Sequence, residues 1–291
     1  MVLLGTESRN SNSEQLDLMS VREIIELMNE ETEKGLRAVE NASPNIEALI
    51  EEILNRDSGR IIYAGAGTSG RLGVLDASEC PPTFHTDPEA FIGLIAGGEK
   101  ALRFAIEGAE DSIELGAADI ESLGVSSGDC VIGIAASGRT PYVKGVLESA
   151  KEKGALTASV SNNTGSEISK IADFAVEVDS GAEIISGSTR LKAGTTQKLV
   201  LNMISTIVNI KRGKVYGNFM IDVSATNEKL ENRAVNMISD ITGEDRETSK
   251  RAYRDSGRHV KTAVVSLILN VGADEAEKLI AKEPNIRKII K

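Results

Sequence analysis

Cysteine and histidine are scarce in this sequence. Its 291 residues include two cysteines, Cys80 and Cys130, and two histidines, His85 and His259. The cysteines are too few for a disulfide framework and lack C-x-x-C spacing, so we expect two small buried side chains. Two histidines leave little for a histidine metal centre or a Ser-His-Asp triad, and we expect both to be structural. Acid and base chemistry therefore falls to carboxylates, and we expect no metal ion.

Long apolar runs and an excess of positive charge are also missing. The best candidate for a membrane helix, residues 263–269, is far shorter than the eighteen or so residues required. Residues 1–15 lack the basic head and apolar core of a signal peptide, so the cytoplasm is the expected compartment. A net charge of −11 argues against a nucleic-acid surface. The negative net charge does not exclude a small anionic ligand, because the N-terminus of a helix can bind an anion in a protein without net positive charge.

The hydrophobic pattern predicts an α/β fold, with a parallel sheet covered by helices on both faces. Short apolar segments alternate with amphipathic ones such as residues 140–153, where apolar side chains recur at helical spacing. The expected strands are residues 60–64, 91–96, 129–135, 155–161 and 174–178.

Helices are also expected before the first strand and after the last strand in the sequence. Ser20 and Glu23 have the spacing of a capping box that begins one helix, and Pro44 begins the next. Residues 195–210 are apolar nearly all round, so this helix is buried in the core or against a second subunit. Residues 1–19 are polar and aperiodic, which indicates an arm that does not pack.

The same patterns divide the chain into three parts. After about Asp222 the strand signals stop and helical segments remain, which indicates a small helical unit at the C-terminus. The expected parts are an N-terminal arm with helices at residues 1–52, an α/β domain at 53–216 and a helical region at 217–291.

The first expected strand runs into a literal G-x-G-x-x-G at residues 65–70. A dinucleotide site requires an acidic residue about twenty positions later, at the end of the second strand. Here the acids near that distance, Asp87 and Glu89, precede the strand at 91–96. A Walker loop does not fit either, because Arg71 follows the last glycine. Alone, the pattern is equally typical of a tight strand-to-helix turn without a ligand.

A second loop of this kind follows the strand at 129–135. Its sequence, ASGRTP at residues 136–141, combines small residues and hydroxyls with a proline that suits a first helical turn. The loop N–H groups then lie at the positive end of the helix dipole. Loops after parallel strands share one edge of the sheet, so the pair predicts a site for one phosphate with a polar body attached. The candidate ligands are Thr68, Ser69, Ser137, Gly138 and Thr140.

Longer motifs resemble a known family. The two loops, with SGSTRLKAGTTQK at residues 186–198, resemble the sugar isomerase (SIS) domain family of phosphosugar-binding proteins. More narrowly, the chain is similar to the N-acetylmuramic acid 6-phosphate etherase family from about residue 6 to its C-terminus. The segments that carry this similarity are TESRN, LDASECPPTF, GLIAGG, EGAED and GNFMIDVSATNEKL. The resemblance implies a SIS-type parallel-sheet sandwich and a homodimer.

The resemblance also implies an activity. The family cleaves the D-lactyl ether at C3 of the phosphorylated sugar without a cofactor, giving N-acetylglucosamine 6-phosphate and D-lactate. It implies that Glu79 is the acid that protonates lactate and that Glu110 is the base that removes the C2 proton. Ser188 is a further candidate phosphate ligand. The expected partners are a small sugar phosphate and a second copy of the chain, with neither nucleic acid nor a membrane.

Several assignments stay open. Arg71, Arg139 and Lys192 are candidates for binding phosphate or the lactate carboxylate, and equally for ordinary salt bridges. A straight helix would place Ser69 and Glu79 about 15 Å apart, which is too far for one sugar phosphate. Either this helix bends early, or a partner subunit completes the site near the subunit interface.

Two other functions share part of this pattern. An aldose–ketose phosphosugar isomerase would use the same loops and C2 base but would release no lactate, and a non-catalytic phosphosugar sensor would bind without turnover. The short chain, with one SIS-like unit, and the presence of both glutamates disfavour the sensor, and release of D-lactate would separate the etherase from the isomerase. We also expect Glu79 to be partly buried beside the apolar Cys80-Pro81-Pro82 segment, and the arm residues 6–10 to close over a site.

Overall fold

The computed structural model describes residues 5–56, 59–222 and 228–290. The chain divides into two compact units, the first comprising Met1–Ser78 with Pro88–Ser205 and the second Glu79–Asp87 with Thr206–Lys291. Each unit has its own hydrophobic core. Cys80 and Cys130 are buried free thiols, as predicted.

A five-stranded parallel sheet forms the centre of the first unit, and the predicted α/β class and all five predicted strands are confirmed. The strand order β2-β1-β3-β4-β5 places β1 between its neighbours β2 and β3. The chain adds β2 on one side of β1 and the later strands on the other side. The order in which strands are added therefore switches sides between β1 and β3, which is the position where open parallel sheets bind ligands. The strands are β1 (Ile61–Gly65), β2 (Phe91–Ile95), β3 (Cys130–Ala135), β4 (Leu156–Ser161) and β5 (Phe174–Glu177).

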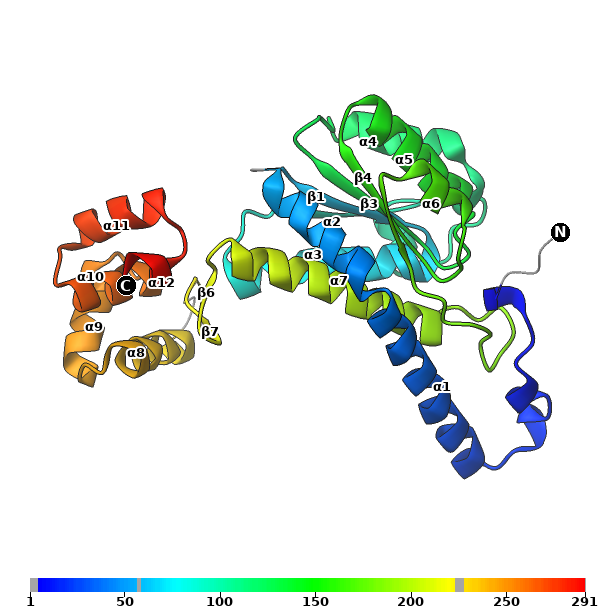
Figure 1. Ribbon diagram of the computed structural model, residues 1–291, viewed down its shortest axis with the longest axis horizontal. Coiled ribbons are helices and arrows are strands. Elements are labelled where there is room, and N and C mark those ends of the chain that lie inside the picture. The colour runs from blue at the N-terminus through cyan, green and yellow to red at the C-terminus, as the bar shows by residue number, and fades with distance from the viewer. Residues whose placement is uncertain (1–4, 57–58, 223–227, 291) are drawn as a thin grey trace. The chain divides into compact units, whose positions relative to one another are not determined.

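Helices cover both faces of the sheet (Figure 1). One face carries α4 (Ile113–Ser122), α5 (Pro141–Glu152) and α6 (Glu167–Ile171), and the other carries α2 (Ser43–Asn55), α3 (Gly67–Phe84) and α7 (Lys192–Lys211). Successive side chains of β3 point to opposite faces of the sheet. Gly133 lies against Val143 of α5, and the next residue, Ile134, lies against α3. On α7, Val200, Leu201 and Ile204 are fully buried, so this apolar helix belongs to the core of its own chain.

Helix α1 (Val21–Asn41) begins with the predicted capping box and extends from the first unit (Figure 1). The Ser20 N–H donates to Glu23 Oε2 at 2.7 Å, and the Glu23 N–H donates to Ser20 Oγ at 3.3 Å. Gly35 lets α1 approach α7 closely, because a Cβ there would lie 3.0 Å from Lys192 Cγ and 3.1 Å from Thr196 Cγ2.

The N-terminal arm is attached at Thr6, so the prediction of an unpacked arm is wrong at this residue; residues 1–4 of the predicted arm lie outside the described residues. Three short 3-10 turns follow one another, and Thr6 in the first is completely buried. The Thr6 N–H donates to Asn163 Oδ1 at 3.3 Å, and Asn163 Nδ2 donates to Thr6 Oγ1 at 2.8 Å. Because Asn163 follows β4, these bonds attach the arm to the carboxyl edge of the sheet. The turns are η1 (Gly5–Glu7), η2 (Ser11–Ser13) and η3 (Leu16–Leu18).

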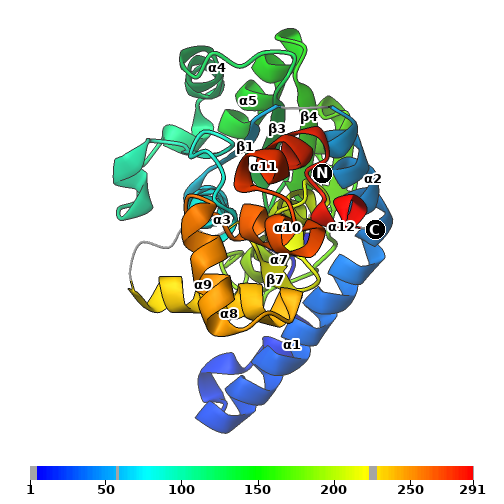
Figure 2. The same ribbon diagram turned by 90° about the vertical axis from the view of Figure 1, so that its left-hand side faces the viewer.

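The second unit contains the predicted C-terminal helices, with a short hairpin that sequence did not indicate. Helix α10 (Val260–Leu269) lies among the other helices of this unit (Figure 2). Its Ala263 and Val264 are fully buried. The imidazoles of His85 and His259 stack, with ring centroids 6.4 Å apart. No helix in the described ranges is both long and apolar enough to span a bilayer. The elements are β6 (Val215–Tyr216), β7 (Phe219–Met220), α8 (Glu228–Thr242), α9 (Arg246–Asp255), α10 (Val260–Leu269), α11 (Ala273–Lys282) and α12 (Ile286–Ile289).

A buried carboxylate holds the amino end of the sheet. Asp129, just before β3, accepts hydrogen bonds from Arg60 Nε at 2.9 Å, Arg60 Nη2 at 2.8 Å and the Ser126 N–H at 2.8 Å. Burial raises the pKa of Asp129, but the hydrogen bonds from Arg60 and Ser126 outweigh it and bring the pKa to about 2. The pair joins the starts of β1 and β3.

Asp129→Ala should lower the free energy of unfolding at pH 7 by about 2 kcal/mol, because hydrogen bonds to a charged group are lost. The folded pKa of about 2 lies below the ordinary 3.8, so this stabilisation is complete above about pH 4 and disappears as pH falls through 2. Urea unfolding of both proteins from pH 7 to pH 2 measures the difference. A gap that stays constant down to pH 2 would contradict this origin of the stability.

Candidate functional site

The first loop joins β1 to α3 with almost no intervening chain. Gly70 permits this, since a Cβ there would lie 2.5 Å from the carbonyl oxygen of Gly65. The two predicted ligands in this loop differ in their surroundings. Ser69 is buried, and its hydroxyl donates to Gln197 Oε1 of α7 at 2.9 Å, whereas Thr68 is only half-buried. The hydroxyl proton of Ser69 is therefore already in use.

The second loop joins β3 to α5 and contains Ser137, Gly138 and Thr140. Gly138 adopts φ +67° and packs so closely on Ser166, the N-cap of α6, that a Cβ would lie 2.3 Å from the serine Cβ. Ser137 Oγ accepts a hydrogen bond from the Arg139 N–H at 3.3 Å. The Thr140 hydroxyl makes no capping bond to α5. Because β1 and β3 are adjacent, the structure brings the two predicted loops together at one edge of the sheet.

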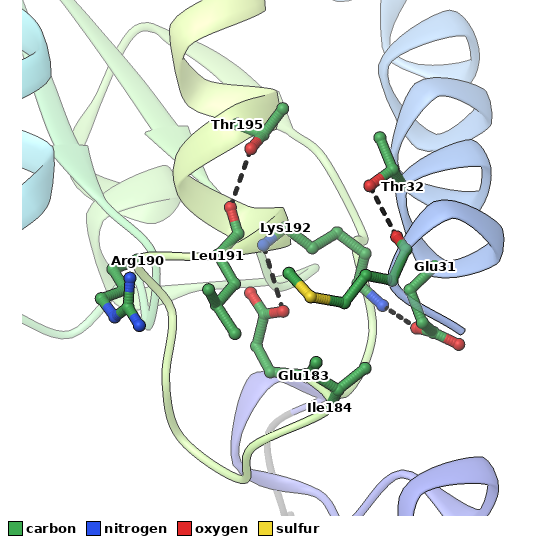
Figure 3. A pocket seen from close by; sticks show the side chains of 9 residues that line it. Glu31, Thr32, Glu183, Ile184, Arg190, Leu191, Lys192 and Thr195 are labelled. Atoms are coloured by element: carbon green, nitrogen blue, oxygen red, sulfur yellow. Dashed lines mark hydrogen bonds and ion pairs between the residues drawn. The ribbon is translucent and has the colours of Figure 1, made fainter. Parts of the chain in front are cut away.

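Lys192 does not lie free as an anion ligand. It forms an ion pair with Glu31 of α1 in which both side chains are almost completely buried, beside a pocket of about 190 Å³ (Figure 3). Burial raises the pKa of Glu31, but hydrogen bonds from Lys192 and Lys34 outweigh it, and the pKa is lowered overall. Glu183 accepts from the N–H groups of Lys192 at 3.1 Å and Ala193 at 2.8 Å. The amino end of α7 therefore already holds a carboxylate.

Ser188 lies in the segment that leads to α7, apart from the two loops in sequence. It is half-buried, and its N–H donates to the Ile185 carbonyl at 2.9 Å. Its role as a phosphate ligand stays a prediction.

Glu110 lines a pocket of about 210 Å³ that also contains the first loop and Arg71. Glu110 lies in η5 (Ala109–Asp111), after Gly108 in a left-handed conformation with φ +76°. Two carbonyls of η4 (Glu99–Leu102) hold Arg71, whose Nε donates to Leu102 at 3.0 Å and whose Nη2 donates to Ala101 at 2.7 Å. The remaining lining residues are Ala66, Gly67, Ala96, Ala101, Phe104, Ala105, Ile106, Glu107, Gly108 and Ala109.

Glu79 has surroundings different from those expected. It lies on α3, which is continuous from Gly67 to Phe84 although it contains Pro81 and Pro82, and its side chain is exposed. The prediction of partial burial is therefore wrong for the single chain, and α3 does not end before Glu79. Glu79 belongs to the second compact unit and Glu110 to the first.

Sequence reasoning missed Asp76, one helical turn before Glu79. Its Oδ1 accepts from Asn202 Nδ2 at 2.6 Å and from Ser205 Oγ at 3.2 Å, which joins α3 to α7. Burial raises its pKa more than hydrogen bonds from Asn202, Ser205 and Tyr63 lower it. The signal available was its place in LDASEC, a motif from which only the glutamate was taken.

This architecture defines the class of the protein. Two family models match the part of the chain that forms the five-stranded parallel sheet. The model for the glucokinase regulatory protein N-terminal SIS domain matches residues 45–151, and that for the SIS domain matches residues 114–207. A phosphoheptose isomerase from Francisella tularensis has a TM-score of 0.48 at 16% identity, covering 66% of this chain and 100% of that one. The family model shows that the chain contains an SIS domain at residues 114–207.

Relatives along the whole chain identify the family more narrowly. An N-acetylmuramic acid 6-phosphate etherase from Exiguobacterium sp. (strain ATCC BAA-1283 / AT1b) is 52% identical over 281 residues, covering 96% of both chains. One from Bacillus mycoides (strain KBAB4) is 51% identical over 290 residues, covering 99% of both. The chain belongs to the N-acetylmuramic acid 6-phosphate etherase family.

Ser137→Ala should raise the KM for a phosphorylated substrate about 10- to 150-fold with little change in kcat, because a hydrogen bond to a charged group is lost. Ser69→Ala is the matched control. Since the Ser69 hydroxyl already donates to Gln197, its loss should lower the melting temperature and leave KM nearly unchanged. Steady-state kinetics and thermal unfolding of both variants measure this difference. Unchanged kinetics in Ser137→Ala would remove this residue from the site.

Proposed function

We propose that this protein cleaves the D-lactyl ether of N-acetylmuramic acid 6-phosphate, giving N-acetylglucosamine 6-phosphate and D-lactate. Membership of the etherase family supports the reaction. The observation that carries the site is the pocket in which the first loop, Arg71 and Glu110 meet at the carboxyl edge of β1. Amino-sugar breakdown and cell-wall recycling are the processes that such a reaction serves.

The reaction proceeds by elimination and then addition of water. In the open-chain sugar, C2–H is acidified by the C1 aldehyde, and Glu110 accepts this proton. The C3–O bond then breaks, its electron pair goes to the lactate oxygen, and Glu79 supplies the proton for that oxygen. Water adds at C3 of the resulting alkene, and C2 regains a proton. Each carboxyl group typically contributes about 10²–10⁴-fold in rate.

The phosphate is held by the two loops. Thr68, Ser137 and Thr140 present half-buried side-chain hydroxyls, and Gly138 brings backbone N–H groups to the start of α5. Helix N-termini bind anions locally, which suits an acidic chain. We assign this role to an SIS domain at residues 53–216, with the arm and first helices at 1–52 and the helical region at 217–291 flanking it.

We also propose that the protein is a homodimer with its site near the subunit interface. Helix α1 carries exposed apolar side chains at Val21, Ile25, Met28 and Leu36, whose spacing puts them on one face. A second copy that covers this stripe would remove it from water. Glu79 lies ten residues beyond Ser69 on a continuous helix, about 15 Å along the axis, so a glutamate from the second copy suits a substrate bound at the loops.

We place the reaction in the cytoplasm. Both cysteines are free thiols, which fits the reducing conditions of that compartment. A substrate with a phosphate and a carboxylate is also retained by a membrane, so an enzyme that uses it acts on the side where it is made.

The purified protein, with EDTA present and no cofactor added, should release D-lactate from N-acetylmuramic acid 6-phosphate and far less from the unphosphorylated sugar. Glu110→Gln should lose both lactate release and exchange of the C2 hydrogen with D₂O, each by about 10²–10⁴-fold. Glu79→Gln should lose lactate release and retain the exchange, because proton removal precedes its step. Lactate quantification and NMR in D₂O measure the two steps.

Each alternative has its own outcome in this experiment. Ketose formation without lactate would favour an isomerase, and binding without turnover a sensor. Loss of exchange in folded Glu79→Gln would reverse the two roles. Full etherase activity in both variants would exclude Glu79 and Glu110 as the catalytic acid and base. Activity that EDTA abolishes and a metal ion restores would overturn the cofactor-free reaction.

Ile25→Asp should convert the dimer to monomers, because it places a charge in the centre of the apolar stripe. Sedimentation velocity measures the mass, with Glu30→Lys on the polar side of α1 as the control that remains dimeric. A wild-type protein that sediments as a monomer at micromolar concentration would contradict the proposal.

A further inference from the structure

The pocket that contains Glu110 has an unusual charge arrangement. Of the residues that line it, Glu107 and Glu110 are acidic and Arg71 is basic, and the others are apolar or glycine. An anion entering this pocket would be repelled by two carboxylates within the same small volume. Only the guanidinium of Arg71 offsets that repulsion.

Arg71 forms no ion pair among the described residues, so its charge is not neutralised by direct contact with a carboxylate. Its hydrogen bonds go to two neutral backbone carbonyls, those of Ala101 and Leu102. A guanidinium has five N–H donors in a planar fork, so three remain after these two bonds. The bonds to Nε and Nη2 fix the plane of the fork, which is the arrangement suited to bidentate binding of a carboxylate.

The chemistry of the substrate requires such a receptor here. N-acetylmuramic acid 6-phosphate carries two anionic groups, the phosphate on C6 and the carboxylate of the lactyl ether on C3. C3 is bonded to C2, where Glu110 acts in the proposed function. The lactyl carboxylate must therefore bind in the neighbourhood of Glu110, and Arg71 is the cation that shares this pocket.

We propose that Arg71 binds the carboxylate of the lactyl group through its free N–H donors. This assignment rests on the proposed function and names the residue that selects its substrate. Arg71 neither gives nor takes a proton; it orients the C3–O bond and balances the charge of the departing lactate beside Glu107 and Glu110. The apolar walls from Phe104 and Ile106 accommodate the methyl group of the same lactyl unit. Phosphosugars without a carboxylate gain nothing from Arg71.

Substrate comparison in Arg71→Met tests the proposal. Lactate release from N-acetylmuramic acid 6-phosphate should fall about 10- to 150-fold in kcat/KM, the loss typical of a hydrogen bond to a charged group. Exchange of the C2 hydrogen of N-acetylglucosamine 6-phosphate with D₂O, which needs Glu110 and the phosphate loops but no carboxylate receptor, should change less than about threefold. Arg103→Met, an exposed arginine outside the pocket, is the matched control and should change neither.

Binding measurements separate this assignment from the proposed function. In a Glu110→Gln background, calorimetry should show that Arg71→Met weakens binding of N-acetylmuramic acid 6-phosphate and leaves N-acetylglucosamine 6-phosphate unchanged. Equal weakening of both sugars, or equal loss of both reactions, would overturn the proposal and make Arg71 a phosphate ligand or a support of residues 99–102. If wild type releases no lactate while this binding difference persists, the proposed function fails and Arg71 remains the carboxylate receptor.

Discussion

The parallel pairing of β1 with β3 is the constraint on which the rest of the site depends. Its register, from Ile61 opposite Cys130 to Gly65 opposite Ile134, makes the two strands end level. Two helices can then begin side by side, provided that the intervening loops are tight, and glycines at positions 65, 70 and 138 make them so. A shift of one residue would turn every side chain of a strand to the opposite face, so the apolar pattern that builds the core also aligns the loops.

The distribution of charge explains how an acidic chain accommodates an anionic ligand. Several helices of the first unit begin near the carboxyl edge of the sheet, and among them α7 is already capped by Glu183. Lys192, at the same helix start, is neutralised by Glu31. Among the described residues no carboxylate caps the start of α5, and Arg71 near the start of α3 bonds only to neutral carbonyls. Local placement, and not the net charge of −11, decides where an anion binds.

Much of the fold could be predicted because its signals are local. Strand segments, the capping box at Ser20 and the apolar character of residues 195–210 depend on neighbours within a few positions. The packing of Thr6 against Asn163, the burial of Asp76 by Asn202 and the use of Ser69 by Gln197 each join residues more than a hundred positions apart. Hydrophobic periodicity in a single sequence does not indicate which distant residues form hydrogen bonds with one another. Glu79 and Glu110 were assigned from motifs that the chain shares with the etherase family. A shared motif predicts which residue stands at a position, but it does not predict how exposed the side chain of Glu79 is in the single chain.

The hydrogen bonds between Thr6 and Asn163 also bear on how the chain is made. The two residues are 157 positions apart, so a ribosome that adds 5–20 residues per second leaves the arm without its partner for roughly 10 to 30 s. During that interval helices α1 and α2 can form from local interactions, whereas the carboxyl edge of the sheet cannot receive the arm until β4 has been synthesised and paired. The arm thus reaches its native position only after β4 has been synthesised and paired, and the carboxyl edge of the sheet is completed only at that point.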